Sequence, residues 1–332
     1  MADTDKPMSS LDQLMKHTTV VADTGDINAI KEHKPQDATT NPSLILKASQ
    51  MPEYVHLFDE AISYARQHGD SLIDGMKVDK VTLALDKLSV NFGVEILKHI
   101  PGRVSTEVDA KFSFDYDNTC IQAERLISLY EEADIPRERI LIKVPATWEG
   151  ICAVESLEEE GIHTNATLIF SYIQALVVAQ YEGTLISPFV GRITDYHMKE
   201  NGLTEYPVAD DDYGVQSVVQ IYNLLKKYDF KTEVMGASFR HADQIIALAG
   251  CDLLTISPNL LHELQERYDD VPIILSMEGA KQSGQENEVI RESDFRLKMC
   301  LDPMASYKLS EGIRSFYNDT RKLENMVRER MS

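Results

Sequence analysis

Polar side chains gather at the expected carboxyl ends of strands in this chain of 332 residues. At five of these ends two residues lie two positions apart, and alternate side chains of a strand point to the same face, so each pair shares one face. The pairs are Thr39 with Asn41, Ser105 with Glu107, Asn165 with Thr167, Ser187 with Phe189, and Ser238 with Arg240. Asp23 ends the first expected strand, and Lys143 lies inside the apolar run 140–144.

Lys143 and Glu107 are charged residues within apolar strands, where a charge needs a partner or a chemical task. An amine held among apolar side chains favours its neutral form, which attacks ketone and aldehyde carbonyls. A carboxylate on another strand can move protons through water, and a second carboxylate, Asp23, can serve a different step. These residues predict Schiff-base chemistry, and Arg192 with Arg240 predicts a pocket for a phosphate group.

Each of these residues taken alone also has a structural explanation. Asp23 can cap the turn that follows its strand, and Ser or Thr at a strand end can bond to nearby backbone. Arg192 and Arg240 can be solvated loop charges. The occurrence of all these groups on one expected rim is what favours a functional site.

Other catalytic classes lack their motifs in this sequence. No G-x-G-x-x-G, G-x-x-x-x-G-K, H-E-x-x-H or G-x-S-x-G sequence occurs. The four cysteines, Cys120, Cys152, Cys251 and Cys300, have no C-x-x-C spacing, which argues against a zinc site and a disulfide framework. The run Asp210-Asp211-Asp212 lies in a polar segment that predicts a solvated turn. We therefore expect neither a cofactor nor a metal.

The charge of the chain argues against two classes of partner. There are 54 acidic and 33 basic side chains, a formal charge of −21, which repels nucleic acid and anionic lipid. Residues 161–181 carry no Asp, Glu, Lys or Arg, but polar residues interrupt the run, and a buried strand followed by a helix is expected there instead of a membrane span. The start of the chain has no apolar core of a secretory signal and is too acidic for a transit peptide, so a cytoplasmic protein is expected.

Strand-like segments alternate with helical periods along the chain. The expected strands are residues 18–23, 37–40, 104–108, 140–144, 164–168, 185–188, 232–237 and 253–256. The helices between them carry apolar residues at three- and four-residue spacing, as in Tyr54, Leu57, Phe58, Ala61, Ile62 and Ala65. Because each helix returns the chain to start the next strand in the same direction, the pattern predicts a parallel α/β fold, a single (β/α)8 barrel over residues 11–332.

Extra elements are expected outside this repeat. Ser10 and Gln13 have the spacing of a capping box, which predicts a helix before the first strand and a disordered tail over residues 1–10. A further helix is expected at 78–98, and another around Ile313 and Phe316. The segment 197–213 reads as a long loop, and the chain after Met277 is weakly patterned.

The motifs in this order resemble those of the transaldolase family, in the long class that includes common bacterial and animal cytosolic enzymes. The resemblance covers about residues 11–330 and rests on six segments. They are Thr-Thr-Val-Val-Ala-Asp-Thr-Gly-Asp from Thr18, Asp-Ala-Thr-Thr-Asn-Pro-Ser-Leu from Asp37, Gly-Arg-Val-Ser-Thr-Glu-Val-Asp-Ala from Gly102, Ile-Leu-Ile-Lys from Ile140, Leu-Ile-Ser-Pro-Phe-Val-Gly-Arg-Ile from Leu185, and Met-Gly-Ala-Ser-Phe-Arg from Met235.

The resemblance implies a reaction of the non-oxidative pentose phosphate pathway. A dihydroxyacetone unit passes from sedoheptulose 7-phosphate or fructose 6-phosphate to glyceraldehyde 3-phosphate or erythrose 4-phosphate. It further implies sugar phosphates as partners and allows a homodimer.

The resemblance also implies roles for the residues. Lys143 matches the Schiff-base lysine, Glu107 the acid/base that works through a water held with Thr167, and Asp23 the group that takes the proton from the C4 hydroxyl. Asn41 and Asn165, with Ser187 nearby, match the groups that hold the donor's hydroxyls. Arg192, Ser238 and Arg240 match the phosphate site, and Thr39, Ser105 and Phe189 are expected to contact the substrate.

Two other functions remain open at the level of the sequence. One is an aldolase that releases free dihydroxyacetone, and the other is a barrel that binds sugar phosphates without turnover. Related fructose 6-phosphate aldolases usually carry Gln where Glu107 stands and Tyr where Phe189 stands, so this chain has the pair of the transferases. The presence of Lys143, Glu107 and Asp23 together disfavours a binding protein.

Overall fold

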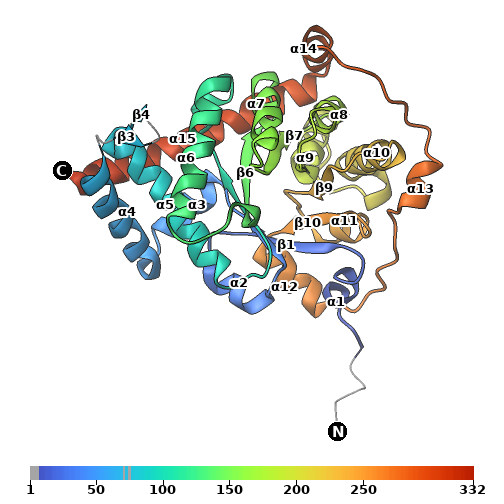
Figure 1. The fold of residues 1–332 in the computed structure, drawn as a ribbon. Coiled ribbons are helices and arrows are strands. Elements are labelled where there is room, and N and C mark those ends of the chain that lie inside the picture. The colour runs from blue at the N-terminus through green and yellow to red at the C-terminus, as the bar shows by residue number, and fades with distance from the viewer. Residues whose placement is uncertain (1–6, 70–71, 74–75) are drawn as a thin grey trace. The chain divides into compact units, whose positions relative to one another are not determined.

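The computed structural model describes residues 7–69, 72–73 and 76–332. Within these residues, the longer strands form a closed barrel in the order β1-β10-β9-β8-β7-β6-β5-β2 (elements labelled in Figure 1). Each strand pair whose register is known is parallel, as expected where helices connect successive strands. The (β/α)8 barrel predicted from the sequence is confirmed.

The barrel strands lie close to the expected positions. They are β1 (Thr19–Asp23), β2 (Asp37–Thr39), β5 (Val104–Glu107), β6 (Ile140–Pro145), β7 (Thr164–Ile169), β8 (Leu185–Pro188), β9 (Glu233–Gly236) and β10 (Leu253–Ile256). Two short strands that the sequence did not predict, β3 (Leu72–Ile73) and β4 (Met76–Lys77), pair with each other in antiparallel fashion.

The chain divides into two compact units, each with four barrel strands. The first unit comprises the described residues up to Asp23 and Leu168–Lys308, and the second comprises Thr24–Thr167 and Leu309–Ser332. Strands β8, β9, β10 and β1 are neighbours in the first unit, and β2, β5, β6 and β7 are neighbours in the second. That the whole chain behaves as one domain remains a prediction.

Helices of the second unit follow the apolar stripes of the sequence. They are α2 (Ile27–His33), α3 (Pro42–Ser49), α4 (Val55–His68), α5 (Lys80–Leu97), α6 (Tyr116–Glu131) and α7 (Trp148–Glu159), with the single-turn helices η1 (Pro52–Tyr54), η2 (Ala110–Phe112) and η3 (Arg137–Arg139). In α4 the buried side chains are those of the expected stripe from Leu57 to Ala65. The helix expected at 78–98 is α5, which Asp79 caps.

The first unit holds the remaining helices. They are α1 (Ser10–Leu14), α8 (Tyr172–Gln180), α9 (Val190–Asn201), η4 (Ala209–Asp211), α10 (Tyr213–Lys227), α11 (Ala242–Ile246), α12 (Pro258–Glu266), α13 (Met277–Lys281) and α14 (Glu292–Leu301). The last helix, α15 (Pro303–Met331), begins in this unit and continues into the second.

The start of the chain differs from the expectation. The cap of α1 is Ser9, whose hydroxyl accepts a hydrogen bond from the Asp12 backbone N–H, so the predicted capping box of Ser10 and Gln13 is wrong. Gln13 instead donates to the Met8 and Asp269 carbonyls. Ser9 and Ser10 are buried in this folded start, so the tail predicted for residues 1–10 is too long at its carboxyl end. Residues 1–6 lie outside the described residues.

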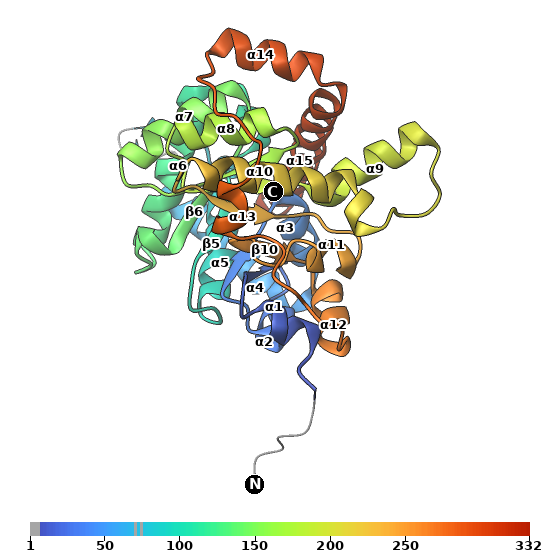
Figure 2. The ribbon, with the colours of Figure 1, turned by 90° about the vertical axis from the view of Figure 1, so that its right-hand side faces the viewer.

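Two polar segments contain helices that the sequence analysis missed. The expected loop at 197–213 begins inside α9, which continues to Asn201 because its polar residues lie on the exposed side of an amphipathic helix. After Met277 the chain forms α13 and α14 before α15. Figures 1 and 2 show α13 beside α10 and α14 beside α8, and the Lys227 ammonium of α10 donates to the Ser283 and Gln285 carbonyls that follow α13.

Candidate active site

Three adjacent strands of the second unit place Glu107, Lys143 and Asn165 side by side. Glu107 on β5 is the register partner of Lys143 on β6, and Lys143 is the partner of Asn165 on β7. The Lys143 ammonium lies 3.1 Å from a Glu107 carboxylate oxygen, and the two side chains are only 5% and 1% exposed. Lys143 also donates a hydrogen bond of 3.2 Å to the Thr40 carbonyl. The buried lysine therefore has a carboxylate in direct contact.

The same face carries the predicted amides and hydroxyls of this unit. The Asn165 side-chain amide donates to the Ser105 hydroxyl at 3.0 Å, and Thr39 on β2 is the register partner of Ser105. Thr167 lies two residues beyond Asn165, and its buried hydroxyl has no hydrogen-bond partner within the described part of the chain. That hydroxyl can bond to a substrate or a water.

Asn41 lies just beyond its strand, as expected, and also has a structural role. Strand β2 ends at Thr39, and Asn41 caps α3, where its side-chain oxygen accepts a hydrogen bond of 3.0 Å from the Leu44 N–H. The capping explanation thus applies to this residue, because a side-chain oxygen at this position satisfies an N–H of the first helical turn. Capping leaves the nitrogen of the amide available as a donor.

The C-terminal helix adds a residue that the sequence analysis did not place in the site. The Phe316 ring of α15 is buried, and its centroid lies 5.8 Å from the Lys143 ammonium. The helix is held there by two contacts: Ser43 donates to Asp319 at 2.5 Å, and Arg321 donates to Asp109 at 2.6 Å. No local motif marks Phe316, because its helical period is the same as that of any core residue.

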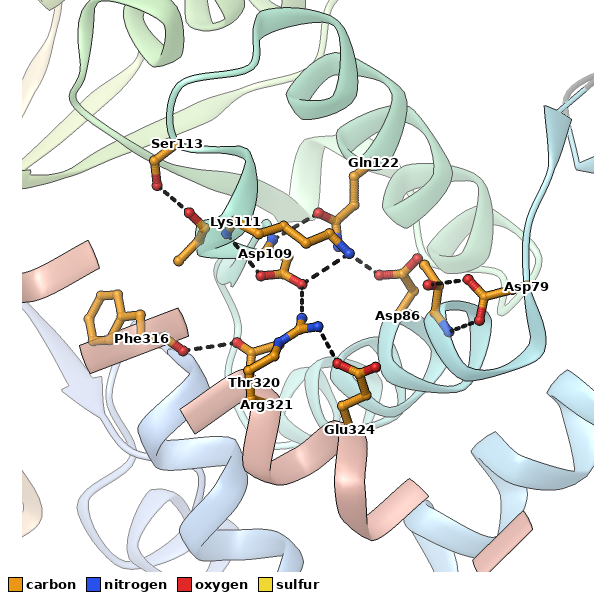
Figure 3. A network of polar contacts seen from close by, with 12 residues as sticks. Asp79, Asp86, Asp109, Lys111, Ser113, Gln122, Phe316, Thr320, Arg321 and Glu324 are labelled. Atoms are coloured by element: carbon orange, nitrogen blue, oxygen red, sulfur yellow. Dashed lines mark hydrogen bonds and ion pairs between the residues drawn. The ribbon is translucent and has the colours of Figure 1, made fainter. Parts of the chain in front are cut away.

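A polar network supports the loop after Glu107 (Figure 3). The Gln122 side chain accepts from the Asp109 backbone N–H at 2.8 Å and donates to Asp86 at 2.7 Å. Asp86 also forms an ion pair of 2.6 Å with Arg125. Burial raises the pKa of the Asp86 carboxyl, while Arg125 and Gln122 act in the opposite direction. These contacts fix the backbone two residues beyond Glu107.

The predicted phosphate residues of the first unit lie on two neighbouring segments. Ser238 and Arg240 lie in the loop after β9, beyond the end of the strand expected at 232–237, and Ser238 has a left-handed φ of 63°. The Gly191 N–H at the start of α9 donates to the Ser238 carbonyl at 2.9 Å. A Cβ at Gly191 would lie 2.4 Å from that oxygen, so only glycine allows this approach. This contact joins the loop after β9 to the amino end of α9.

Arg240 is held by an acidic partner and by its own backbone. Asp195 of α9 accepts two bonds from the guanidinium, at 2.7 Å from Nη2 and 3.1 Å from Nε. The Arg240 N–H donates to the Gln244 side chain at 2.8 Å. The explanation of Arg240 as a freely solvated loop charge therefore does not apply.

Gln244 connects this loop to a buried carboxylate. Its amide donates to Asp212 at 2.8 Å and to the Thr194 hydroxyl at 3.1 Å, and Thr194 in turn donates to Asp212 at 2.6 Å. Asp212 is fully buried and caps α10. The prediction of a solvated turn for the three consecutive aspartates is thus wrong for Asp212, whose charge is satisfied inside the fold.

Arg192 lies in the same unit and contacts an aromatic side chain. Its guanidinium lies 4.9 Å from the centre of the Phe189 ring, and Phe189 packs edge-on against Phe170 at 5.5 Å. Ser187 is buried on β8 two residues before Phe189.

Asp23 ends β1 and is half-buried, and the cap of the following helix α2 is Asp26. Capping of that helix therefore does not explain Asp23.

The described part of the chain offers no cluster of three or more His, Cys, Asp or Glu side chains that could hold a metal ion. Among the helices of the described residues, none has both the length and the apolar character needed to span a membrane.

Fold and site together define a class of protein, the parallel (β/α)8 barrels that carry a buried lysine paired with a carboxylate on adjacent strands. The comparisons with known proteins narrow this class. Residues 20–327 match the family "Transaldolase/Fructose-6-phosphate aldolase", and the chain belongs to this family.

Similar proteins in this family come from animals and bacteria. The chain is 55% identical to the transaldolase of Bos taurus and 55% identical to that of Homo sapiens, in each case over 97% of this chain and 94% of the relative. It is 52% identical to the transaldolase of Shewanella pealeana over 98% of this chain and 99% of the relative. The family resemblance seen in the sequence is confirmed.

Proposed function

We propose that this protein is a transaldolase of the pentose phosphate pathway. It transfers a dihydroxyacetone unit from a ketose phosphate, sedoheptulose 7-phosphate or fructose 6-phosphate, to an aldose phosphate, glyceraldehyde 3-phosphate or erythrose 4-phosphate. The observation that carries the proposal is the buried contact of 3.1 Å between Lys143 and Glu107. The relatives named transaldolase support it, because they are 55% and 52% identical to this chain over 97% and 98% of its length.

The reaction begins when Lys143 attacks the ketone of the donor. Glu107 takes a proton from the amine as the carbon–nitrogen bond forms and returns protons to the former carbonyl oxygen, which leaves as water. The buried Thr167 hydroxyl holds the water through which these protons move. The product of this stage is a protonated imine, whose nitrogen draws electrons from the neighbouring carbon–carbon bond.

Asp23 then takes the proton from the C4 hydroxyl, and the carbon–carbon bond breaks. The electron pair moves into the imine, so the three-carbon unit stays on Lys143 as a neutral enamine and the aldose phosphate leaves. A second aldose phosphate adds to the enamine by the reverse of these steps. Hydrolysis of the new imine consumes one water and frees the ketose product.

The remaining residues bind the sugar. Asn41, Asn165, Ser105, Thr39 and Ser187 hold the hydroxyls of the donor. Arg192, Ser238 and Arg240 bind the phosphate, and charge-assisted bonds from Arg give this subsite its affinity on a protein of net charge −21. Phe189, whose ring centre lies 4.9 Å from the Arg192 guanidinium, carries no hydroxyl.

Release of free dihydroxyacetone is the competing activity, because the family name includes fructose-6-phosphate aldolase. Two residues favour transfer. Glu107 stands where the aldolases usually carry Gln, and Phe189 stands where they usually carry Tyr. Phe189 lacks the hydroxyl of that tyrosine, so it cannot give the enamine a proton.

Borohydride reduction tests the proposed function. Added with fructose 6-phosphate, it should fix a three-carbon adduct on Lys143, which peptide mass spectrometry locates. The Lys143→Met variant should show neither the adduct nor sugar exchange. An unmodified Lys143 in the active protein would overturn the proposal. Predominant release of dihydroxyacetone in the presence of an aldose phosphate would identify an aldolase instead.

The charge of the chain supports the rest of the proposal. Sugar phosphates are the partners, with no nucleic acid and no membrane surface, since a charge of −21 repels polyanions.

The proposed location is the cytoplasm, and a homodimer is the proposed assembly. The chemistry requires neither a cofactor nor a metal.

A further inference from the structure

A polar cavity opens beside Glu107 within the second unit. Its volume is about 50 Å³. Glu107 and Asn41 are the candidate-site residues in its lining, and Asp86, Asp109 and Lys111 bring further charges to it. Ser89 of α5 and Thr320 of α15 line other parts of the wall. We call this space the side cavity.

The size and lining of the side cavity suit a few water molecules. A cavity needs roughly 10–15 Å³ of such volume per water, and each water needs two to four polar partners. Carboxylates, an ammonium and hydroxyls supply these partners here. Lys111 is part of the lining and its side chain is 32% exposed, so the wall of the cavity reaches solvent at this residue.

The walls of the side cavity are held in place by the network in Figure 3. Gln122 joins Asp86 to the Asp109 backbone, and the Asp109 carboxylate accepts from Arg321 of α15 at 2.6 Å. Lys111 lies 3.3 Å from the same carboxylate. Because each buried charge in this wall has a fixed partner, the space is maintained and does not collapse onto Glu107.

Glu107 is the link between this space and the reacting amine. Its carboxylate contacts Lys143 at 3.1 Å, and the same residue lines the side cavity. Imine formation releases one water at this point, because a ketone and an ammonium give a protonated imine and water. Imine hydrolysis consumes one water at the same carbon. A bound sugar occupies the space in front of Lys143 during both steps.

We infer that the side cavity is the route by which this water leaves and returns. Water lost in imine formation passes Glu107 into the cavity and exchanges with solvent near Lys111, and a cavity water later hydrolyses the product imine. This inference rests on the proposed function. It assigns a task to Ser89, Asp86 and Lys111, which are not among the proposed sugar-binding residues.

The fate of the donor's ketone oxygen tests the route. The reaction is run in water labelled with heavy oxygen, quenched early, and the product ketose is fragmented in a mass spectrometer to read the label at its carbonyl carbon. If the released water exchanges through the side cavity, the wild-type product carries oxygen from bulk water. In Ser89→Leu, which fills the cavity, we expect several-fold greater retention of the donor's own oxygen and a several-fold lower kcat.

Ser89→Ala is the matched control. The Ser89 hydroxyl bonds only to the Leu85 carbonyl of its own helix at 3.2 Å among the contacts found, so alanine removes a polar atom without filling the space. This variant should label its product as the wild type does. Should Ser89→Leu fail to fold, Leu85→Phe fills the cavity from the preceding helical turn and is measured in the same way.

The outcomes separate the two proposals. A filled, folded variant with wild-type label and kcat overturns the side cavity as the route. Borohydride trapping at Lys143 is measured in every variant, because a missing adduct in the wild-type protein would instead overturn the proposed function. An adduct with unchanged label therefore counts against the side cavity alone.

Discussion

At the residue scale, Lys143 shows how contacts stabilise a reactive amine inside the fold. Its amine is buried and contacts only Glu107, the Thr40 carbonyl and the Phe316 ring among the partners that the described residues show. A buried charge without a partner costs several kcal/mol, so the ion pair with Glu107 allows the amine to be stored inside the fold. In the proposed reaction the substrate replaces that contact, and the carboxylate lies in position to move protons.

Arg240 gives a prediction at the same scale. Arg240→Leu removes the guanidinium that we propose binds the substrate phosphate, where each charge-assisted bond contributes about 1.5–3 kcal/mol. We expect the KM for fructose 6-phosphate to rise by roughly 10- to 100-fold, with a smaller change in kcat, in steady-state kinetics. Arg296→Leu, which removes an exposed pair with Glu292 on α14, is the control and should leave KM unchanged. An unaltered KM in Arg240→Leu would exclude this residue from the phosphate subsite.

At the scale of elements, the start of α10 supports the loop after β9. Asp212 caps α10 and bonds to Thr194 of α9 and to Gln244 of α11, which in turn holds the Arg240 backbone. One buried carboxylate thus joins three helices and, through Gln244, the loop after β9. This arrangement explains why a polar segment that reads as a loop in the sequence contains a fully buried charge.

Asp212→Ala tests that support. The variant loses a helix cap and leaves Thr194 and Gln244 without a buried partner, so we expect the free energy of unfolding in urea to fall by about 2–4 kcal/mol. The KM for the phosphorylated donor should rise as well. Asp115→Ala removes the cap of α6, whose hydrogen bond to the Asn118 N–H is exposed, and its cost should be only about 1 kcal/mol without an effect on KM. Equal losses in the two variants would contradict the role of the buried network.

At the scale of the whole molecule, a buried acidic group makes stability fall as the pH becomes alkaline. Burial raises the pKa of the Cys251 thiol from 9.0 to about 12. In the unfolded chain the thiol ionises near its ordinary pKa, while the folded chain keeps its proton. Since the unfolded state then binds fewer protons, stability is fully present below about pH 9 and is lost as the pH rises toward 12.

Cys251→Ala should reduce this pH dependence. Between about pH 8 and about pH 10, urea unfolding of the wild type should lose about 1 kcal/mol more than the variant does. The variant is less stable at each pH because it loses buried volume, so the comparison uses the change with pH and not the absolute value. Cys300, which is exposed, serves as the control through Cys300→Ala. A parallel decline in the wild type and in Cys251→Ala would refute the assignment.

The sequence allowed most of the fold and of the candidate site to be predicted, for reasons visible in particular residues. Strand positions followed from short apolar runs such as 140–144, and α4 followed from its stripe of Leu57, Phe58 and Ala61, because burial of one face imposes a period on the chain. Segments without such a period, α13 and α14, were missed. So was the reach of α9, since helices with few buried residues leave little pattern.

Local chemistry in the sequence was therefore sufficient to nominate Lys143, Glu107 and the residues around them, because strand periodicity determines which side chains share a face. Only the tertiary structure decided that Glu107 and Asn165 flank Lys143 in register and that Phe316 lies over its amine. The same is true of Asp212, which became a buried junction, and of the side cavity beside Glu107. Such contacts join residues up to hundreds of positions apart, and periodicity carries no information about which distant segments meet.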